Sequence, residues 1–106
     1  MGQFVIAAYR PRPGMEARLL ELVKDHSPIL RSQGLVTDRA SYAMRAKDGT
    51  ILEVFEWKSP EAINAAHTNQ AVLAMWARFN EACFFESLAN LEECKQMFAG
   101  FEPIDL

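Results

Sequence analysis

The sequence has few cysteines, little net charge and no cluster of charges of one sign. Its two cysteines, Cys83 and Cys94, are too few for a disulfide scaffold, and their spacing fits no metal-site pattern. The formal net charge is −3, from 11 basic and 14 acidic residues, and the basic residues form no stripe. A basic stripe is the usual requirement for binding nucleic acid or anionic lipid, so we expect neither partner.

No segment has the composition of a membrane span or an export signal. The longest apolar run, Phe4 to Tyr9, is far shorter than the roughly 20 residues that a spanning helix needs. The first residues lead directly into a strand-like segment, without the basic start and long apolar stretch of a signal peptide. These absences predict a soluble, cytoplasmic protein with no membrane partner.

The chain does contain enough apolar residues to build a core. Of its 106 residues, 50% are hydrophobic and 10% are aromatic, which is typical of a folded chain and not of a disordered one. The length suits one domain. We therefore expect a single domain over residues 1–106, in which residues 90–106 form a short helix and a tail.

Strand-like and helix-like patterns alternate along the chain, punctuated by proline, glycine and capping residues. Pro28 interrupts the first helical pattern and predicts either a kink or a second short helix capped by Ser27. The predicted elements are a strand at 3–10, a helix at 15–33, strands at 35–46 and 51–57, helices at 60–68 and 70–81, and a strand at 83–88. The order β-α-β-β-α-β predicts an α+β domain of the ferredoxin-like type, with an antiparallel sheet and helices on one face.

The predicted strands are apolar on both faces. In the first strand, alternate residues such as Ile6 and Ala7 point to opposite sides of the sheet, and both sides are apolar. The helices can cover only one side, and burying a large apolar side chain contributes roughly 1.5–3 kcal/mol. We therefore expect a homodimer in which two sheets pack face to face. The alternative is that the C-terminal segment covers the second face within one chain.

Several segments resemble the antibiotic-biosynthesis-monooxygenase-like family. They are the hairpin Asp48-Gly49-Thr50, the strand at 53–58, the helix start Ser59-Pro60-Glu61-Ala62 and the stretch His67-Thr68-Asn69. The resemblance covers roughly residues 3–88 and implies a dimeric α/β barrel, in which two ferredoxin-like sheets face each other. The family includes cofactor-free monooxygenases of aromatic polyketides, haem-degrading enzymes and small proteins without an assigned activity.

The resemblance implies a protein that binds a small hydrophobic or aromatic ligand, with cofactor-independent monooxygenation of an aromatic or enolic substrate as its activity. The alternatives are a haem-binding or haem-degrading protein and a non-enzymatic binding or stress-type barrel. In the haem-degrading branch, a histidine at the place of His67 ligates the iron, and an asparagine stands on the first strand. This chain has Phe4 to Ala7 in place of that asparagine, so we expect no cofactor.

The catalytic candidates are His67, Glu53 and Glu56. The two glutamates are three residues apart on one strand, so they point to opposite faces and one of them must point inward. An inward carboxylate is costly unless it is paired, which makes it a candidate for function. Paired with His67, it could act as a general base on a phenol or enol. The alternatives are a helix-capping role for His67 and ion pairs of the glutamates with Arg10, Arg39 or Arg45.

The ligand-binding candidates are mainly aromatic. We expect a cavity between sheet and helices, with Trp76 and Val72 in one wall and residues of the third strand, including Trp57, in the other. Tyr9 and Tyr42 are further candidates, and core packing is the alternative for Trp76. On the apolar stripe of the first helix, we interpret His26 as a partly buried structural residue. The sequence contains no set of metal ligands and no complete catalytic constellation.

Overall fold

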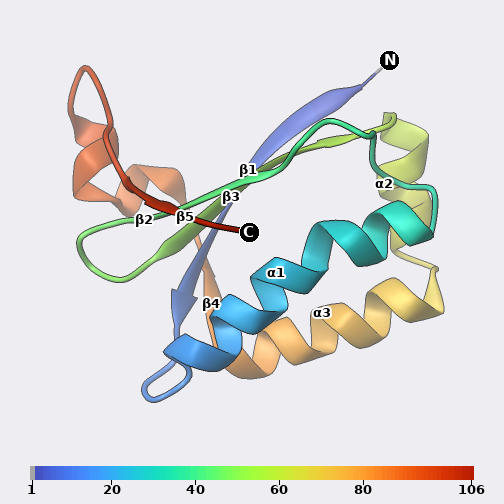
Figure 1. The fold of residues 1–106 in the computed structure, drawn as a ribbon, viewed down its shortest axis with the longest axis horizontal. Helices are drawn as coiled ribbons and strands as arrows, with labels where there is room; N and C mark the ends of the chain where they lie inside the picture. The colour runs from blue at the N-terminus through green and yellow to red at the C-terminus, as the bar shows by residue number, and fades with distance from the viewer. Residues whose placement is uncertain (1) are drawn as a thin grey trace.

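Five antiparallel strands form one open sheet, and three helices cover one of its faces (Figure 1). The computed structural model describes residues 2–106. The strands are β1 (Gln3–Pro11), β2 (Tyr42–Arg45), β3 (Ile51–Trp57), β4 (Cys83–Glu86) and β5 (Glu102–Ile104), in the spatial order β4-β1-β3-β2-β5. The helices are α1 (Glu16–Ser32), α2 (Pro60–Ala66) and α3 (Gln70–Ala82). The α+β class predicted from the sequence is confirmed.

Side-chain caps separate α2 from α3. The Ser59 hydroxyl accepts a hydrogen bond from the backbone N–H of Ala62 at 3.1 Å, and Pro60 occupies the first turn. The Asn69 side chain accepts one from the N–H of Val72 at 3.1 Å. These contacts place the break between the two helices where the sequence predicts it.

The first helix and the second strand differ from the prediction. Helix α1 continues through Pro28, which is exposed, and Ser27 caps no second helix because its hydroxyl is used inside the protein. Only residues 42–45 of the predicted strand at 35–46 belong to β2. Near the start of the predicted strand, the Thr37 hydroxyl accepts a hydrogen bond from the N–H of Arg39 at 3.2 Å. Such a local side-chain bond favours a loop after Thr37. Before it, Val36 bridges Trp57 and the Thr37 N–H donates to the Glu56 carbonyl at 3.0 Å, so the start of the predicted strand does pair with β3.

The C-terminal segment adds structure that the sequence pattern did not predict. Two 3₁₀ helices, η1 (Leu88–Asn90) and η2 (Glu92–Lys95), replace the single short helix expected there. Beyond them, the expected tail contains β5, which pairs with β2 at the edge of the sheet. A three-residue strand with a proline at its centre has too weak a pattern to be recognised in the sequence.

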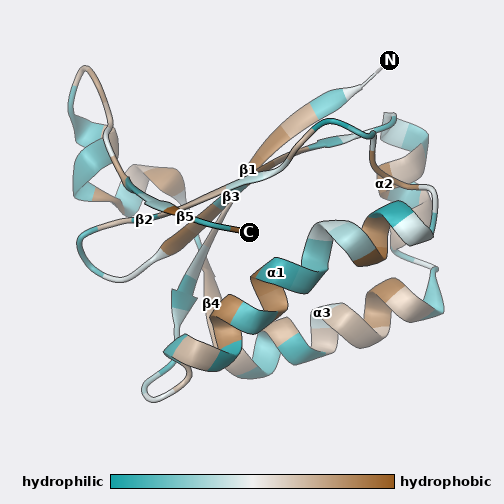
Figure 2. Cartoon of the chain, viewed as in Figure 1, coloured by the Kyte–Doolittle hydropathy of each residue, from teal (hydrophilic) through white to brown (hydrophobic). Residues whose placement is uncertain are grey.

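The two faces of the sheet are covered unequally. Hydrophobic residues recur along β1, β3 and α1 (Figure 2), and on the helix side the core includes Ile51, Phe55 and Trp57. On the opposite side, Leu91 of the C-terminal segment packs over Ala8 and Leu52. The rest of that side is bare, with Phe4 57%, Ile6 49% and Tyr42 68% exposed. We call these three residues the bare strip. The C-terminal segment therefore covers only part of the second face.

None of the helices within residues 2–106 combines the length and the hydropathy needed to cross a bilayer.

Candidate functional site

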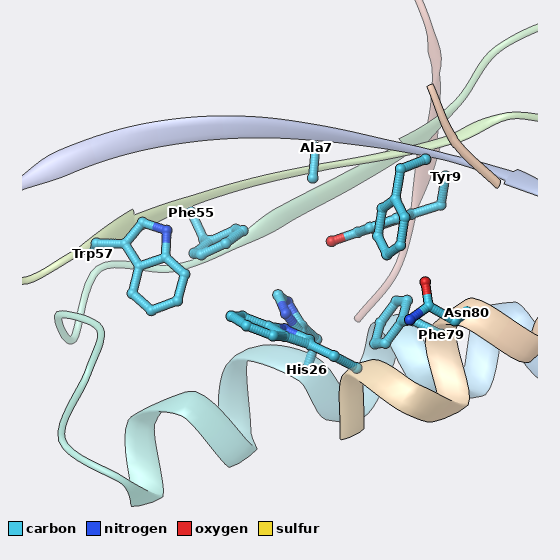
Figure 3. A pocket seen from close by; sticks show the side chains of 9 residues that line it. Ala7, Tyr9, His26, Phe55, Trp57, Phe79 and Asn80 are labelled. Atoms are coloured by element: carbon cyan, nitrogen blue, oxygen red, sulfur yellow. The ribbon is translucent and has the colours of Figure 1, made fainter. Parts of the chain in front are cut away.

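A cavity of about 360 Å³ lies between the sheet and helices α1 and α3. Figure 3 shows Ala7, Tyr9, Phe55 and Trp57 on the sheet side, and His26, Phe79 and Asn80 on the helix side. The complete lining is Ala7, Tyr9, His26, Phe55, Trp57, Trp76, Phe79, Asn80 and Phe85. Most of these side chains are aromatic, and the volume is in the range of small-molecule sites.

Three polar side chains converge on the carboxylate of Glu53 beneath this cavity. Glu53 comes from β3 and is 0% exposed. The Tyr9 hydroxyl donates a hydrogen bond to Oε1 at 2.8 Å, and Nδ1 of His26 lies 2.8 Å from the same oxygen. The Ser27 hydroxyl donates to Oε2 at 3.3 Å. Because an unpaired buried carboxylate is costly, these partners are what allow Glu53 to point inward.

The contact between His26 and Glu53 is close but poorly aligned. The atoms are 2.8 Å apart, yet within residues 2–106 the buried Nδ1 has no partner that meets the angular requirement of a hydrogen bond. A modest rotation of the ring would bring an Nδ1–H group into line with the carboxylate. The ring is held among the rings of Tyr9, Phe55 and Phe79, at centroid distances of 6.4, 5.2 and 5.2 Å.

Burial also sets the protonation of two other groups near the cavity. Burial, reinforced by the negative charge of Glu53 and the hydrogen bond to it, raises the pKa of Tyr9 well above its ordinary value. Tyr9 therefore stays protonated near neutral pH and remains a donor. Burial raises the pKa of the Cys83 thiol to about 11, against an opposing effect of Arg12. Because the thiolate is the reactive form, Cys83 is not suited to act as a nucleophile.

The structure brings four of the eight predicted site residues together. Tyr9, Trp57 and Trp76 line the cavity, and Glu53 lies beneath it. Val72 faces the same interior but is completely buried in the core, outside the lining. Tyr42 belongs to the bare strip, because its register partner is Val54 and not an inward residue of β3.

His67 and Glu56 lie away from the cavity. His67 is exposed at the C-terminus of α2, where its Nδ1 donates a hydrogen bond to the Ile63 carbonyl at 2.9 Å. Its ring contacts Trp76 at a centroid distance of 5.2 Å. The Glu56 carboxylate forms an ion pair with Arg39 at 2.7 Å and accepts a hydrogen bond from the Thr37 hydroxyl at 2.9 Å. His67 therefore occupies the helix-capping position, and Glu56 forms the pair with an arginine, that the sequence offered as alternatives to a catalytic role.

His26 and Ser27 belong to the site although the sequence pattern does not identify them as site residues. Both residues are buried on the inner side of α1. The available signal was the place of His26 on the apolar stripe together with an inward glutamate on β3. Recognising the pair requires the packing of α1 against β3, which no local pattern shows.

The structure bears on the metal and haem candidates in two ways. Within residues 2–106, no group of three or more His, Cys, Asp and Glu side chains is placed to hold a metal ion. The resemblance would assign haem iron to His67, but His67 does not line the cavity described above. The histidine that does line it, His26, lies against Glu53.

Comparisons with known proteins do not place the chain in a family. No family model, no curated protein and no solved structure matches it. The function therefore has to be inferred from the cavity and the chemistry of its residues.

Proposed function

We propose that this protein binds a small, flat aromatic or enolic molecule and removes a proton from it, as a cofactor-independent monooxygenase would. The observation that carries the proposal is a histidine backed by a buried carboxylate at an aromatic cavity: His26 lines the cavity, and its Nδ1 lies 2.8 Å from Glu53. The ferredoxin-like fold and the family resemblance are part of the same proposal.

The walls of the cavity favour a flat and mostly apolar ligand. Trp57, Trp76 and Phe55 offer ring faces and edges, which pack well against planar molecules. Few polar side chains reach the lining. A ligand with a single hydroxyl group could bury its rings against the aromatic walls and direct that hydroxyl toward His26.

His26 and Glu53 supply the proton chemistry. Because Nδ1 of His26 faces Glu53, Nε2 is the nitrogen available to a ligand. Transfer of a proton from the ligand hydroxyl to Nε2 leaves the ligand as an anion, and the Glu53 carboxylate stabilises the imidazolium that forms. A phenolate or enolate is electron-rich, and it is the form that can react with dioxygen without a cofactor.

The strand arrangement and the bare strip support the rest of the proposal. The order β4-β1-β3-β2, with helical connections after β1 and β3, is the order of a ferredoxin-like sheet. The bare strip presents large apolar side chains on one side of an antiparallel sheet. A second copy of the chain would bury the same strip against itself across a two-fold axis, which gives a homodimer.

Binding and deprotonation can be measured with 4-nitrophenol, whose anion is yellow, and with nitrobenzene, which lacks the hydroxyl. Both should quench tryptophan fluorescence saturably, because Trp57 and Trp76 line the cavity. At a pH below the pKa of the free probe, bound 4-nitrophenol should show the absorption of its anion. His26→Gln should retain binding and lose that absorption. The proposal fails if neither probe binds or if His26→Gln ionises the probe as well as the wild type does.

An oxygen electrode separates an enzyme from a binding protein. Uptake of oxygen above the spontaneous rate with an enolisable polycyclic ketone such as anthrone, and its loss in His26→Gln, would establish monooxygenation. Saturable binding without oxygen uptake would assign the protein to the alternative, a binding module.

A further inference from the structure

We propose that Ser27 and Ser41 form a proton path from Glu53 to solvent, on a route that does not pass through the cavity. The proposal deepens the proposed function, because it concerns the fate of the proton that His26 removes. Its test requires no ligand and can therefore succeed or fail independently.

A bound ligand creates the need for such a path. The cavity is lined mostly by aromatic rings, so a ligand that fills it displaces water from His26. A proton passed to His26 and Glu53 would then have no solvent to leave through on that side. Repeated turnover requires another exit or the release of the ligand with its proton.

The hydroxyl groups of two serines extend from the carboxylate on the side not used by Tyr9 and His26. Tyr9 and His26 both lie at Oε1 of Glu53, whereas Ser27 contacts Oε2 at 3.3 Å. The Ser27 hydroxyl lies 2.6 Å from that of Ser41. Ser27 is buried and Ser41 is partly exposed, and neither belongs to the cavity lining. The two serine hydroxyls therefore lead from the buried carboxylate to the surface.

Serine hydroxyls suit this role because each can donate one proton while it accepts another. A proton passed from His26 arrives at Oε1 of Glu53, and rotation of the protonated carboxyl group brings it to the side of Ser27 while the two serine hydroxyls turn toward solvent. That proton then moves to Ser27, the proton of Ser27 moves to Ser41, and that of Ser41 moves to water. Every O–H bond that breaks is replaced by one that forms. One proton leaves, and the two hydroxyl groups are restored.

The longest contact identifies the slow step. The separation of 3.3 Å between Ser27 and Glu53 exceeds the usual range for an O–H···O hydrogen bond, whereas 2.6 Å between the serines lies within it. Transfer at Ser27 must wait until its hydroxyl moves closer to the carboxylate. Tyr9 offers no alternative exit, because among residues 2–106 its hydroxyl contacts Glu53 alone and leads to no second hydroxyl group.

The test is the exchange with water of the His26 Nδ1–H proton, which is buried against Glu53 and does not face the cavity, measured by NMR on the whole protein labelled with ¹⁵N-histidine. Ser41→Ala and Ser27→Ala should each slow this exchange by at least about tenfold, in keeping with the loss of a positioned proton-transfer group. Ser41→Thr keeps a hydroxyl and should exchange at the wild-type rate. Ser41 is only partly buried, so its alanine variant decides the question if Ser27→Ala does not fold.

Ser32→Ala is the matched control. Ser32 is exposed on the same helix, and its hydroxyl donates only to the Ile29 carbonyl, at 2.7 Å. This variant should leave the exchange unchanged. Wild-type exchange in Ser41→Ala would overturn the proton path. Failure of 4-nitrophenol to bind would instead count against the proposed function, while a slowed exchange in Ser41→Ala would still support the path.

Discussion

At the scale of single residues, the carboxylate of Glu53 joins side chains from separate parts of the fold. Tyr9 comes from β1 and His26 and Ser27 come from α1, and all three lie around one carboxylate from β3. Without that carboxylate, Tyr9 and His26 would lose their polar partner, and Ser27 would keep only Ser41. Glu53 is therefore a structural residue as well as a functional candidate.

Replacing Glu53 by Leu should lower the free energy of unfolding by about 3 kcal/mol, because it leaves buried polar partners unpaired. Glu53→Gln keeps the shape and one acceptor and should cost less. Glu56→Gln is the control: its partner Arg39 is mostly exposed, so the cost should be about 1 kcal/mol or less. Urea unfolding of the three variants measures these differences. Equal costs at positions 53 and 56 would contradict the buried cluster.

Part of this site is visible in the sequence. The alternation of β3 shows that Glu53 and Glu56 point to opposite faces, and the aromatic residues indicate an aromatic cavity. Neither the alternation along the strand nor the aromatic content identifies the histidine that lies beside Glu53. His67 stands near a helix break and looks available, whereas His26 looks like part of the core. Only the packing of α1 on the sheet places His26, and not His67, beside the carboxylate.

At the scale of elements, α1 is helical across a residue that normally ends a helix. Pro28 has no backbone N–H, so the carbonyl four residues earlier, that of Lys24, loses its donor. Both residues are exposed, so water can satisfy that carbonyl. The inner side of the helix, with Leu22, Val23 and Leu30, remains buried against the core. Tertiary packing thus outweighs a local signal that predicted an interruption.

Pro28→Ala should therefore stabilise the protein. It restores a helical hydrogen bond, worth part of the roughly 3 kcal/mol that an interior proline costs, and it loosens the unfolded chain by about 1 kcal/mol. A net gain of about 1–2 kcal/mol is expected in urea unfolding. Pro13→Ala, in the exposed turn before α1, should give no gain. A destabilised Pro28→Ala protein would show that the ring contributes packing that outweighs the missing bond.

The elements that the sequence predicts well are those with strong caps and regular periodicity. The starts of α2 and α3 follow from Ser59 and Asn69. Strand β2 is shorter than its β-favouring pattern because residues 38–41 form a loop between it and the separate bridge of Val36 with Trp57. Strand β5 exists only through its pairing with β2. Both discrepancies reflect interactions outside the window in which a local pattern is read.

At the scale of the whole molecule, the two faces of the sheet have different surroundings. Helices α1 and α3 close one face, and the C-terminal segment closes part of the other. The bare strip is what remains. Its neighbour Arg39 lies over the ring of Phe4, at 6.0 Å from its centroid, and pairs with Glu56. An apolar strip with a charged margin has the general anatomy of a protein interface.

Sedimentation at micromolar concentration should therefore return about twice the chain mass of 12.0 kDa. Ile6→Glu places a charge in the bare strip and should give monomers or aggregate. The control is Leu73→Glu, at an exposed apolar residue of α3, which should leave the dimer intact. A well-folded wild-type monomer would contradict the homodimer.

The two outer strands of the sheet also limit how copies of this chain can associate. Strand β5 is three residues long and carries Pro103, which has no N–H to offer another strand. At the opposite edge, the guanidinium groups of Arg10 and Arg12 lie over the ring of Phe84, at 5.3 Å and 4.0 Å from its centroid. Short, proline-bearing or charged edges discourage the open-ended strand addition that leads to fibrous aggregates. Removing residues 101–106 would uncover the edge of β2 and should therefore promote aggregation by strand addition.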